Sequence, residues 1–453
     1  MARDPDRVNL ERPEIQEKAG TQMNYFTHLI NSKGLGQLAH RGLVISRRYG
    51  VTPERMMRAF DRLIGVLEQH GCRATFPVTA VTLARHPAYF QWLQERGMEL
   101  AIHGWTHVNL ERYPLEQQRE HISRAIDTFA RYGISATGFR SPYLRHDSTI
   151  CEAVEATGLR YVSNQPILWA TTIEFPQPQG RAQAYQRAIN SYTPWSAAEH
   201  AALPTARGQI VEIPVSLPDD EMLIERLGAT SDQVARVWTE ALHQTYVRGE
   251  LFTLQLHPER AEVCLPALSR VLSAARAYDP PVWIARLDEI ADWWQQRLAL
   301  HVAVTVEGHD KYNIFVHGPA EASILVRFAQ VIGEARAWED GYQIVKSHRF
   351  TVRCNPRPFI GISRRTNQSL VNFLQQQGYL VEISDDHTNY PVYLDRQNFT
   401  QGDERSLIQQ IEADSFPLIR INCWPGVTRS AVAITGDVDA LTLWDYGLRL
   451  FGK

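Results

Sequence analysis

Short apolar runs alternate with longer amphipathic segments along residues 42–298. The runs have the length of β-strands and are bounded by turn residues, whereas the segments between them carry apolar side chains at the spacing of a helix face. The first amphipathic segment has clear limits, because Thr52 and Pro53 form a helix start signal and Gly71 a stop signal. The pattern predicts strands at 42–46, 74–78, 100–103, 136–140, 160–163, 210–215, 251–256 and 282–284, and further helices at 89–96, 115–132, 148–157, 231–247, 262–278 and 287–297.

This alternation is typical of a parallel sheet, because parallel strands are joined by helical crossovers. About seven such units in about 260 residues fit a barrel better than an open sheet. In such barrels the chemistry lies at the carboxyl ends of the strands, and His103, Arg140, Asn164 and His257 all fall at or just past a predicted strand end. The predicted fold class is therefore α/β, with a distorted (β/α) barrel over residues 41–298.

The pattern changes near Leu300, where apolar and polar positions begin to alternate strictly. This alternation predicts antiparallel strands joined by turns. The expected parts outside the barrel are an N-terminal extension at 1–40, a small antiparallel β domain at 299–355, a short α/β segment at 356–428, and a C-terminal strand and helix at 429–453 that return to the barrel.

Composition narrows the range of partners. The chain has 453 residues, 44% hydrophobic and 21% charged, with a formal net charge of -3, so nucleic acid is not an expected partner. We expect neither a signal peptide nor a membrane span, because the first residues lack an apolar core and no window approaches about 18 apolar residues. The five cysteines are scattered without CxxC spacing, which favours reduced thiols and a cytoplasmic protein.

Two histidines follow the predicted strand at 100–103, in the sequence His103-Gly-Trp-Thr-His107. Neutral imidazole is a common zinc ligand, and both rings can point at one place if the backbone turns between them. A catalytic metal needs about three protein ligands and an open position, so another part of the chain must supply the third. The alternative is that both are ordinary polar residues at a strand end.

Three motifs at the predicted strand ends together resemble those of the polysaccharide deacetylases with the NodB-homology fold. They are His103-Gly-Trp-Thr-His107, Arg140-Ser-Pro-Tyr143 and Leu254-Gln-Leu-His257-Pro258. The resemblance covers roughly residues 40–298. It implies a distorted barrel with fewer than eight regular units. It also implies a metal-dependent hydrolase that removes acetyl groups from N-acetylated, sometimes O-acetylated, sugars.

The same resemblance implies roles for single residues. His257 matches the acid that protonates the leaving amine, and Arg140 matches the residue that holds the catalytic carboxylate in place. The backbone near Tyr143 is expected to donate to the oxyanion. Substrate contacts are predicted for Tyr143, Asn164, Trp169 and Asp220, although the loop carrying Asp220 is equally well explained as a polar rim of the barrel.

The chain departs from the family at two places. The family's first barrel strand ends in two aspartates, one a base and one a metal ligand, whereas residues 42–46 are followed by Arg47 and Arg48. Guanidinium groups neither bind a cation nor accept a proton. The second departure is Val162, where related enzymes often carry an aspartate that tunes the acid histidine.

A copy of the missing motif stands at the other end of the chain. Residues 430–442 read Ser-Ala-Val-Ala-Ile-Thr-Gly-Asp-Val-Asp-Ala-Leu-Thr and resemble the family's first strand in its Asp-Val-Asp form. We hypothesise that this strand inserts at the seam of the barrel. It would bring Asp437 as the base and Asp439 as the third metal ligand to His103 and His107.

We expect Asp437 and Asp439 to face opposite ways if the strand stays extended, so the hypothesis includes a turn at Gly436. Two alternatives remain for this strand. In one, both aspartates are solvated loop carboxylates. In the other, the strand enters the barrel of a second subunit, which makes the protein a homodimer.

The preferred prediction is a hydrolase that removes acetyl groups from an N-acetylated sugar or polysaccharide precursor. The expected cofactor is a divalent metal, with zinc preferred, and the expected partner is a carbohydrate or small-molecule substrate. One alternative is an inactive deacetylase-like protein that binds a glycan or a partner, which Arg47 and Arg48 favour. The other is a metal-dependent hydrolase of a small non-peptide amide.

Overall fold

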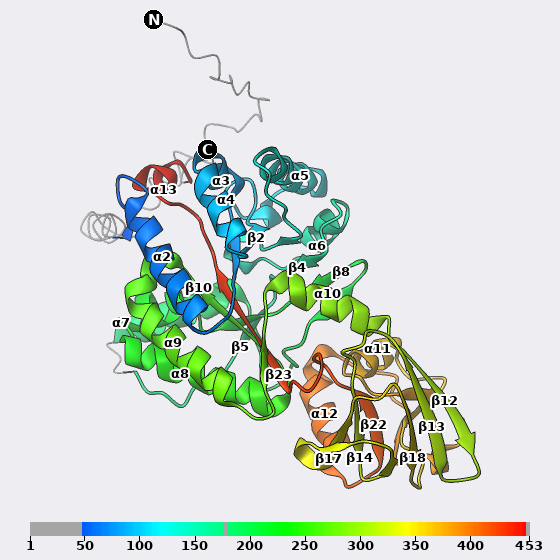
Figure 1. Cartoon of the computed structure of the whole chain (residues 1–453). Helices are drawn as coiled ribbons and strands as arrows, with labels where there is room; N and C mark the ends of the chain where they lie inside the picture. The colour runs from blue at the N-terminus through cyan, green and yellow to red at the C-terminus, as the bar shows by residue number, and fades with distance from the viewer. Residues whose placement is uncertain (1–47, 176–178, 450–453) are drawn as a thin grey trace, which may run out of the picture.

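The computed structural model describes residues 48–175 and 179–449 and arranges them as a barrel-like domain and a smaller lobe (Figure 1). The predicted strand at 42–46, residue Arg47 and the extension at 1–40 lie outside the described residues. The lobe follows the last barrel helix, and the chain then returns from the lobe into the barrel as strand β23, drawn in red in Figure 1.

The largest sheet has 12 strands, and its central run is parallel in the order β9-β10-β23-β1-β2-β3-β4-β8. β8 and β9 lie at opposite ends of this run, yet only Ile213 and Pro214 separate them in the chain. The sheet must therefore curl until its two ends meet, which confirms the predicted distorted (β/α) barrel. The central strands are β1 (Thr75–Val78), β2 (Glu99–Ile102), β3 (Gly138–Phe139), β4 (Tyr161–Val162), β8 (Ile210–Glu212), β9 (Val215–Leu217), β10 (Leu251–Leu256) and β23 (Ser430–Gly436).

Shorter strands extend this sheet at its margins, and helices cover its outer face (Figure 1). The marginal strands are β5 (Pro166–Leu168), β6 (Trp195–Ser196), β7 (Thr205–Arg207) and β11 (Val282–Ile284). The helices are α2 (Glu54–Gln69), α3 (Ala80–Arg85), α4 (Pro87–Glu95), α5 (Leu115–Arg131), α6 (Ser148–Glu155), α7 (Gln179–Tyr192), α8 (Ser231–Arg248), α9 (Ala261–Ala277), α10 (Leu287–Leu298) and α13 (Leu443–Arg449). The apolar pattern did not predict α7 or the π-helical turn at Glu221–Leu227, because both lie in segments without a clear helical periodicity.

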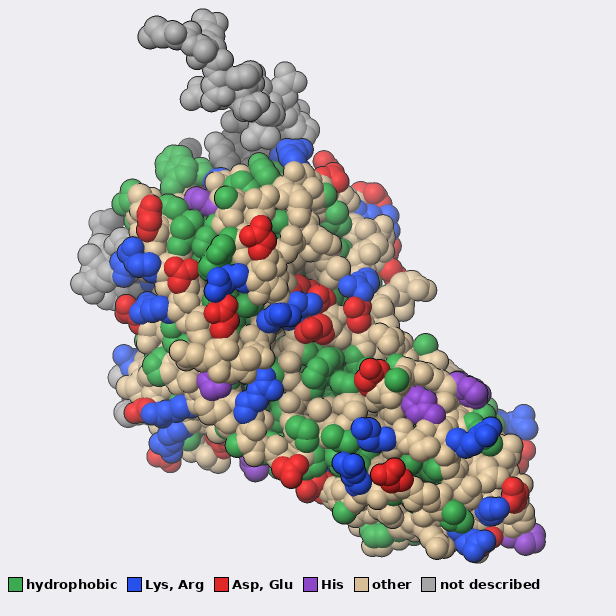
Figure 2. Space-filling model, viewed as in Figure 1, with side chains coloured by type: hydrophobic (Ala, Val, Ile, Leu, Met, Phe, Trp, Pro, Cys, Tyr) green, Lys and Arg blue, Asp and Glu red, His purple; other side chains and the backbone are tan. Residues whose placement is uncertain are grey.

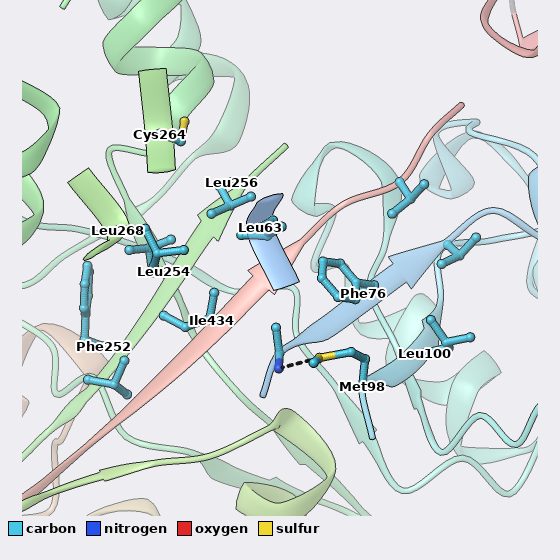
Figure 3. Packing of buried hydrophobic residues seen from close by; sticks show 14 of the residues in the cluster. Leu63, Phe76, Met98, Leu100, Phe252, Leu254, Leu256, Cys264, Leu268 and Ile434 are labelled. Carbon is cyan, nitrogen blue, oxygen red and sulfur yellow. Dashed lines mark hydrogen bonds between the residues drawn. The ribbon is translucent and has the colours of Figure 1, made fainter. Parts of the chain in front are cut away.

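The two faces of the barrel strands carry different side chains, because successive residues of a strand point to opposite sides. Phe76, Leu100, Leu254 and Ile434 belong to the cluster that packs between the sheet and its covering helices (Figure 3). The intervening positions, among them Ala101, Tyr161 and Ala433, form a second cluster that fills the barrel interior. Because of the same alternation, side chains at the carboxyl ends of the strands point into the mouth of the barrel.

β23 lies between β10 and β1 and is buried along its whole length. It pairs with β10 from Leu251↔Ala431 to Leu256↔Gly436, and with β1 through Thr75↔Thr435. Figure 3 shows Ile434 of this strand beside Leu254 and Phe252 of β10. Burial of an aliphatic side chain of this size contributes about 1.5–3 kcal/mol. The C-terminal strand is therefore an integral strand of its own chain's barrel.

The lobe contains three small sheets and two helices. Its parts are β12 (His301–Glu307), β13 (Lys311–His317), β18 (Arg349–Arg353) and β15 (Gln330–Ile332) in one sheet; β16 (Arg336–Ala337), β17 (Tyr342–Val345), β14 (Ile324–Arg327) and β22 (Leu418–Ile421) in a second; β20 (Val381–Ile383), β19 (Ile360–Ile362) and β21 (Val392–Leu394) in a third; and α11 (Gln368–Gln376) and α12 (Glu404–Ala413). The first two sheets are antiparallel, as expected, and the third is parallel. Because β22 pairs with β14, the segments expected at 299–355 and 356–428 share a sheet.

Polar contacts fasten the lobe to the barrel where the chain returns. The indole Nε1 of Trp293 donates to the Cys423 carbonyl at 2.8 Å, and that of Trp424 donates to the Gly249 carbonyl at 2.8 Å. Arg405 of α12 forms a buried ion pair with Glu250, beside β10. On the face in Figure 2, basic and acidic side chains are interspersed, and hydrophobic ones gather near this junction. Across the residues described, no helix has the length and apolar character needed to span a membrane.

Candidate metal centre and active site

The histidine loop is formed by a backbone reversal directly after β2. Gly104 has φ of +83°, a left-handed conformation that favours glycine, and a Cβ there would lie 3.1 Å from Cε1 of His121. The His121 ring faces the backbone N–H groups of Trp105 and Thr106 at 3.3 and 3.4 Å. Burial lowers the pKa of His121 to about 4, so its ring is neutral and has a nitrogen able to accept. The loop thereby brings His107 back toward His103.

The third predicted ligand lies beside these histidines. Asp439 Oδ1 is 3.5 Å from His103 Nε2 and 3.4 Å from His107 Nε2. Ligands about 2.0–2.1 Å from a tetrahedral ion are about 3.3–3.4 Å from one another, so these separations suit a zinc-sized ion. His103 Nδ1 lies 2.8 Å from the Arg140 carbonyl oxygen, which directs Nε2 toward the shared point. The donor set of two imidazoles and a carboxylate fits a catalytic metal with an open position.

The backbone of the C-terminal strand corrects one sequence expectation. Strand alternation has a period of two residues, so Asp437 and Asp439 belong to the same face, and the expectation that they point opposite ways was wrong. The chain stays extended past Gly436, with the Val438 N–H donating to the Pro77 carbonyl at 2.8 Å. No turn at Gly436 is needed. A Cβ there would instead lie 2.8 Å from the ring of Phe76.

Asp437 is held at both carboxylate oxygens. Arg140 donates to Oδ1 at 3.0 Å, and Gln255 Nε2 donates to Oδ2 at 2.8 Å. Arg140 is fully buried, and its other donors reach Thr435 and Ser163. Asp437 Oδ2 lies 4.0 Å from His103 Nε2, so this carboxylate borders the group formed by His103, His107 and Asp439. The sequence motifs assign no role to Gln255, although its position two residues before His257 predicts the same strand face.

His257 follows β10, the strand that pairs with β23, and it is paired with a buried carboxylate. Its Nδ1 is 2.7 Å from Asp220 Oδ1, and its backbone N–H donates to Asp220 Oδ2 at 2.7 Å. Burial opposes the charged imidazolium, but the attraction of Asp220 prevails and raises the pKa of His257 well above its usual value. Burial likewise opposes the Asp220 anion, and His257 and Arg260 outweigh it, so the pKa of Asp220 is lowered. Asp220 is fully buried by these contacts, so its predicted substrate contact is corrected to an ion pair with His257.

Residues 52–162 match the family model described as polysaccharide deacetylase. Within residues 52–162 the chain therefore matches a polysaccharide deacetylase domain. No curated protein matches the chain. Similar solved structures include a chain assigned as a polysaccharide deacetylase from Mycobacterium smegmatis, at 21% identity over 60% of this chain and 85% of that one, with a TM-score of 0.42. The allantoinase PuuE has 18% identity over 53% and 74% of the two chains, with a TM-score of 0.42. A chain assigned as a polysaccharide deacetylase from Pseudomonas aeruginosa PAO1 has 19% identity over 52% and 72%, with a TM-score of 0.41.

Two other predicted substrate contacts need correction. Trp169 is 2% exposed and packed beneath Arg248, whose guanidinium carbon lies 5.2 Å from the ring centroid, so no ring face is open to a sugar. Asn164 is also fully buried, and its Oδ1 accepts from the Ser141 backbone at 2.7 Å. It supports the loop after β3, and a substrate cannot reach it without a rearrangement.

Tyr143 lies where a substrate can reach it. It has φ of +63° within the short 3₁₀ helix Pro142–Leu144, and its side chain is 45% exposed. Its ring centroid is 4.6 Å from that of His107, at an interplanar angle of 74°. The ring packs edge-on against His107, and its predicted substrate contact stays a prediction.

Arg48, one of the two arginines that follow residues 42–46, lies away from the strand end where the family's aspartates are expected. Arg48 lies next to α2 and pairs with Glu225 at 2.6 Å, and Arg47 is outside the described residues. The place between β10 and β1 belongs to β23, and Asp437 and Asp439 follow directly after this strand. The second departure has a parallel explanation, because Asp220 supplies the carboxylate partner of His257 that Val162 cannot.

Proposed function

We propose that this protein is a metal-dependent hydrolase that removes the acetyl group from an N-acetylated sugar or polysaccharide precursor. The observation that carries the proposal is the approach of Asp439 Oδ1 to within 3.4–3.5 Å of both histidine Nε2 atoms. Two of these ligands come from one loop and the third from the other end of the chain. Packing of the barrel does not require these three ligands to meet, nor does it require Asp437 and His257 to lie beside them.

His103, His107 and Asp439 would hold the ion, and their nitrogen and oxygen donors suit zinc. When bound, such an ion polarises the acyl oxygen and lowers the pKa of water in the site. Asp437 is the proposed base that takes the proton of the attacking water. Hydrogen bonds from Arg140 and Gln255 hold this carboxylate in one orientation. It therefore needs no change of rotamer before it accepts the proton of the water.

His257 is the proposed acid for the leaving amine. Asp220 holds the Nδ1 side of the ring, which leaves Nε2 to donate a proton to the departing nitrogen. The raised pKa keeps His257 protonated at neutral pH, as an acid requires. His257 Nδ1 and Asp220 Oδ1 lie at hydrogen-bond distance, so this pair acts as an ion pair and not as a second metal site.

The deciding experiment compares the metal content and activity of the full-length protein with those of Asp439→Ala. We expect about one zinc per wild-type chain, loss of that zinc in Asp439→Ala, and acetate release from acetylated chito-oligosaccharides by the wild type only. Asp414→Ala is the matched control, because Asp414 is an exposed carboxylate in the lobe. The same zinc content in the wild type and Asp439→Ala, or no zinc in either, would refute the proposed metal centre. A wild type that binds zinc but releases no acetate would favour the alternative of a binding protein.

A further inference from the structure

Helix α3 and the threonine before it contact the C-terminal segment at two places. The segment is 437–449, which carries the proposed base and metal ligand and then forms α13. In the sequence Thr79 and Asp439 are 360 residues apart, so no local chain connectivity fixes this geometry. We call Thr79, Thr82, Arg85 and His86 the α3 latch.

The first contact holds the backbone of the proposed ligand. Thr82 Oγ1 is 3.0 Å from the Asp439 carbonyl oxygen, and Thr79 Oγ1 is 3.3 Å from it. The two hydroxyls are 2.8 Å apart. Each hydroxyl has one proton, so the arrangement that satisfies both has Thr79 donating to Thr82 and Thr82 donating to Asp439. Both threonines are 1% exposed, so water does not compete for the carbonyl.

The second contact anchors the helix that follows. Asp445 of α13 is 2% exposed, yet it is surrounded by donors. Arg85 Nη1 lies 3.1 Å from Oδ1, and His86 Nε2 lies 3.0 Å from Oδ2. The Thr442 backbone N–H and hydroxyl also donate to Oδ2, at 3.0 and 2.9 Å. A buried carboxylate with this many partners strongly specifies the docked position of α13.

We propose that the α3 latch is a positioning element that sets metal affinity by holding the backbone of Asp439 and the helix beyond it. The proposal rests on the metal centre proposed above. The latch threonines reach the metal centre through the Asp439 carbonyl oxygen, so they act through the backbone of this residue. Metal binding and docking of residues 437–449 are therefore reciprocally coupled: each stabilises the other by the same free energy.

Zinc affinity of full-length variants, measured by competition with a chromophoric chelator, tests the first contact. Thr82→Val keeps the shape of the side chain and removes the donor, and we expect about tenfold weaker zinc binding or more, as for other outer partners of metal ligands. Thr82→Ser should restore most of the affinity. The matched control is Thr245→Val, which removes a buried hydroxyl bonded within α8. Unchanged affinity in Thr82→Val, or an equal loss in Thr245→Val, would overturn the proposal.

Amide hydrogen exchange of residues 437–449, with and without zinc, tests the coupling and also the second contact. Zinc should slow exchange in this segment of the wild type, and Asp445→Asn should speed it and weaken zinc binding. If Thr82→Val does not fold, Asp445→Asn decides the matter alone. A wild type that binds no zinc refutes the metal centre itself, whereas wild-type binding with unaltered variants refutes only the latch. Amide exchange rates in residues 437–449 that do not change when zinc is added would also refute the latch.

Discussion

At the scale of single residues, Asp437 and Asp439 show what a motif can and cannot predict. The resemblance predicted both positions, and strand alternation places them on one face, contrary to the expectation of opposite faces. Gln255 lies inside the motif at 254–258 but had no predicted role, and Asp220 and the latch threonines lie outside the three motifs. Their contacts join residues from 37 to 360 positions apart, and only folding reveals such pairs.

The Asp220–His257 pair predicts a pH effect on activity. Asp220 raises the pKa of His257, so the proposed acid stays protonated into alkaline solution, and activity should fall only when His257 loses its proton. Asp220→Asn removes the stabilising charge and should move the alkaline limb of the kcat profile to lower pH. The loss of general-acid catalysis at neutral pH should be about 10²-fold or more. If the alkaline limb of the kcat profile does not move in Asp220→Asn, His257 is not the acid.

Asp219 predicts a pH effect on stability. Burial, reinforced by Asp220, raises the pKa of Asp219 to about 7, and its Oδ2 has no hydrogen-bond partner among the described residues. The folded protein therefore binds more protons than the unfolded chain between about pH 4 and 7, and stability falls as pH rises through this window. Asp219→Asn should match the wild type at pH 4 and exceed it at pH 8 by about 2–4 kcal/mol. Urea denaturation at both pH values measures this, and equal differences at the two would contradict it.

At the scale of elements, periodicity predicted most barrel strands and helices because each must present an apolar face to the same core. α2, α5, α8 and α10 begin and end close to the predicted limits. The misses include α3, α7 and the π-helical turn, which the periodicity did not predict, and the sheet that the two lobe segments share. The pairing of β22 with β14 joins residues more than 90 positions apart, so no local pattern could predict it.

The barrel interior at β3 requires a glycine. A Cβ at Gly138 would lie 1.9 Å from the ring of Tyr161, which is fixed by its bond to Glu99 at 2.6 Å. Gly138→Ala should cost about 3 kcal/mol of unfolding free energy by overpacking, and it should lower activity by displacing Arg140. Gly65→Ala is the control, because a Cβ there meets nothing within 4 Å and the helix should gain about 0.5–1 kcal/mol. Thermal or urea denaturation of both variants decides the matter, and a stable, active Gly138→Ala would contradict it.

At the scale of the whole molecule, the lobe lies between the last barrel helix and the strand that completes the sheet. The return path is fixed by Trp424, by Arg429 and by the buried pair of Arg405 with Glu250. The order of parts along the chain was predicted from the sequence. The contacts that join lobe to barrel were not, because each pairs residues from different domains.

The Arg405–Glu250 pair predicts coupling between lobe and barrel. Arg405→Met leaves Glu250 buried without its cation, which should cost about 3–5 kcal/mol. Adding Glu250→Leu removes the stranded charge and should recover most of the loss. Urea denaturation of the single and double variants measures both effects. A double variant as unstable as the single one would show that the unpaired charge of Glu250 does not cause the loss of stability.

The position of β23 has a consequence for how the protein is made. Translation proceeds from the N-terminus, so a growing chain that has completed β10 still lacks the strand between β10 and β1. At about 5–20 residues per second, the ribosome needs roughly 10–35 seconds to add the residues that separate β10 from the end of β23. During that interval two parallel strand edges stand unpaired, and such edges are sites for misassociation with other chains. The nascent protein is therefore both inert and vulnerable until its last strand leaves the ribosome.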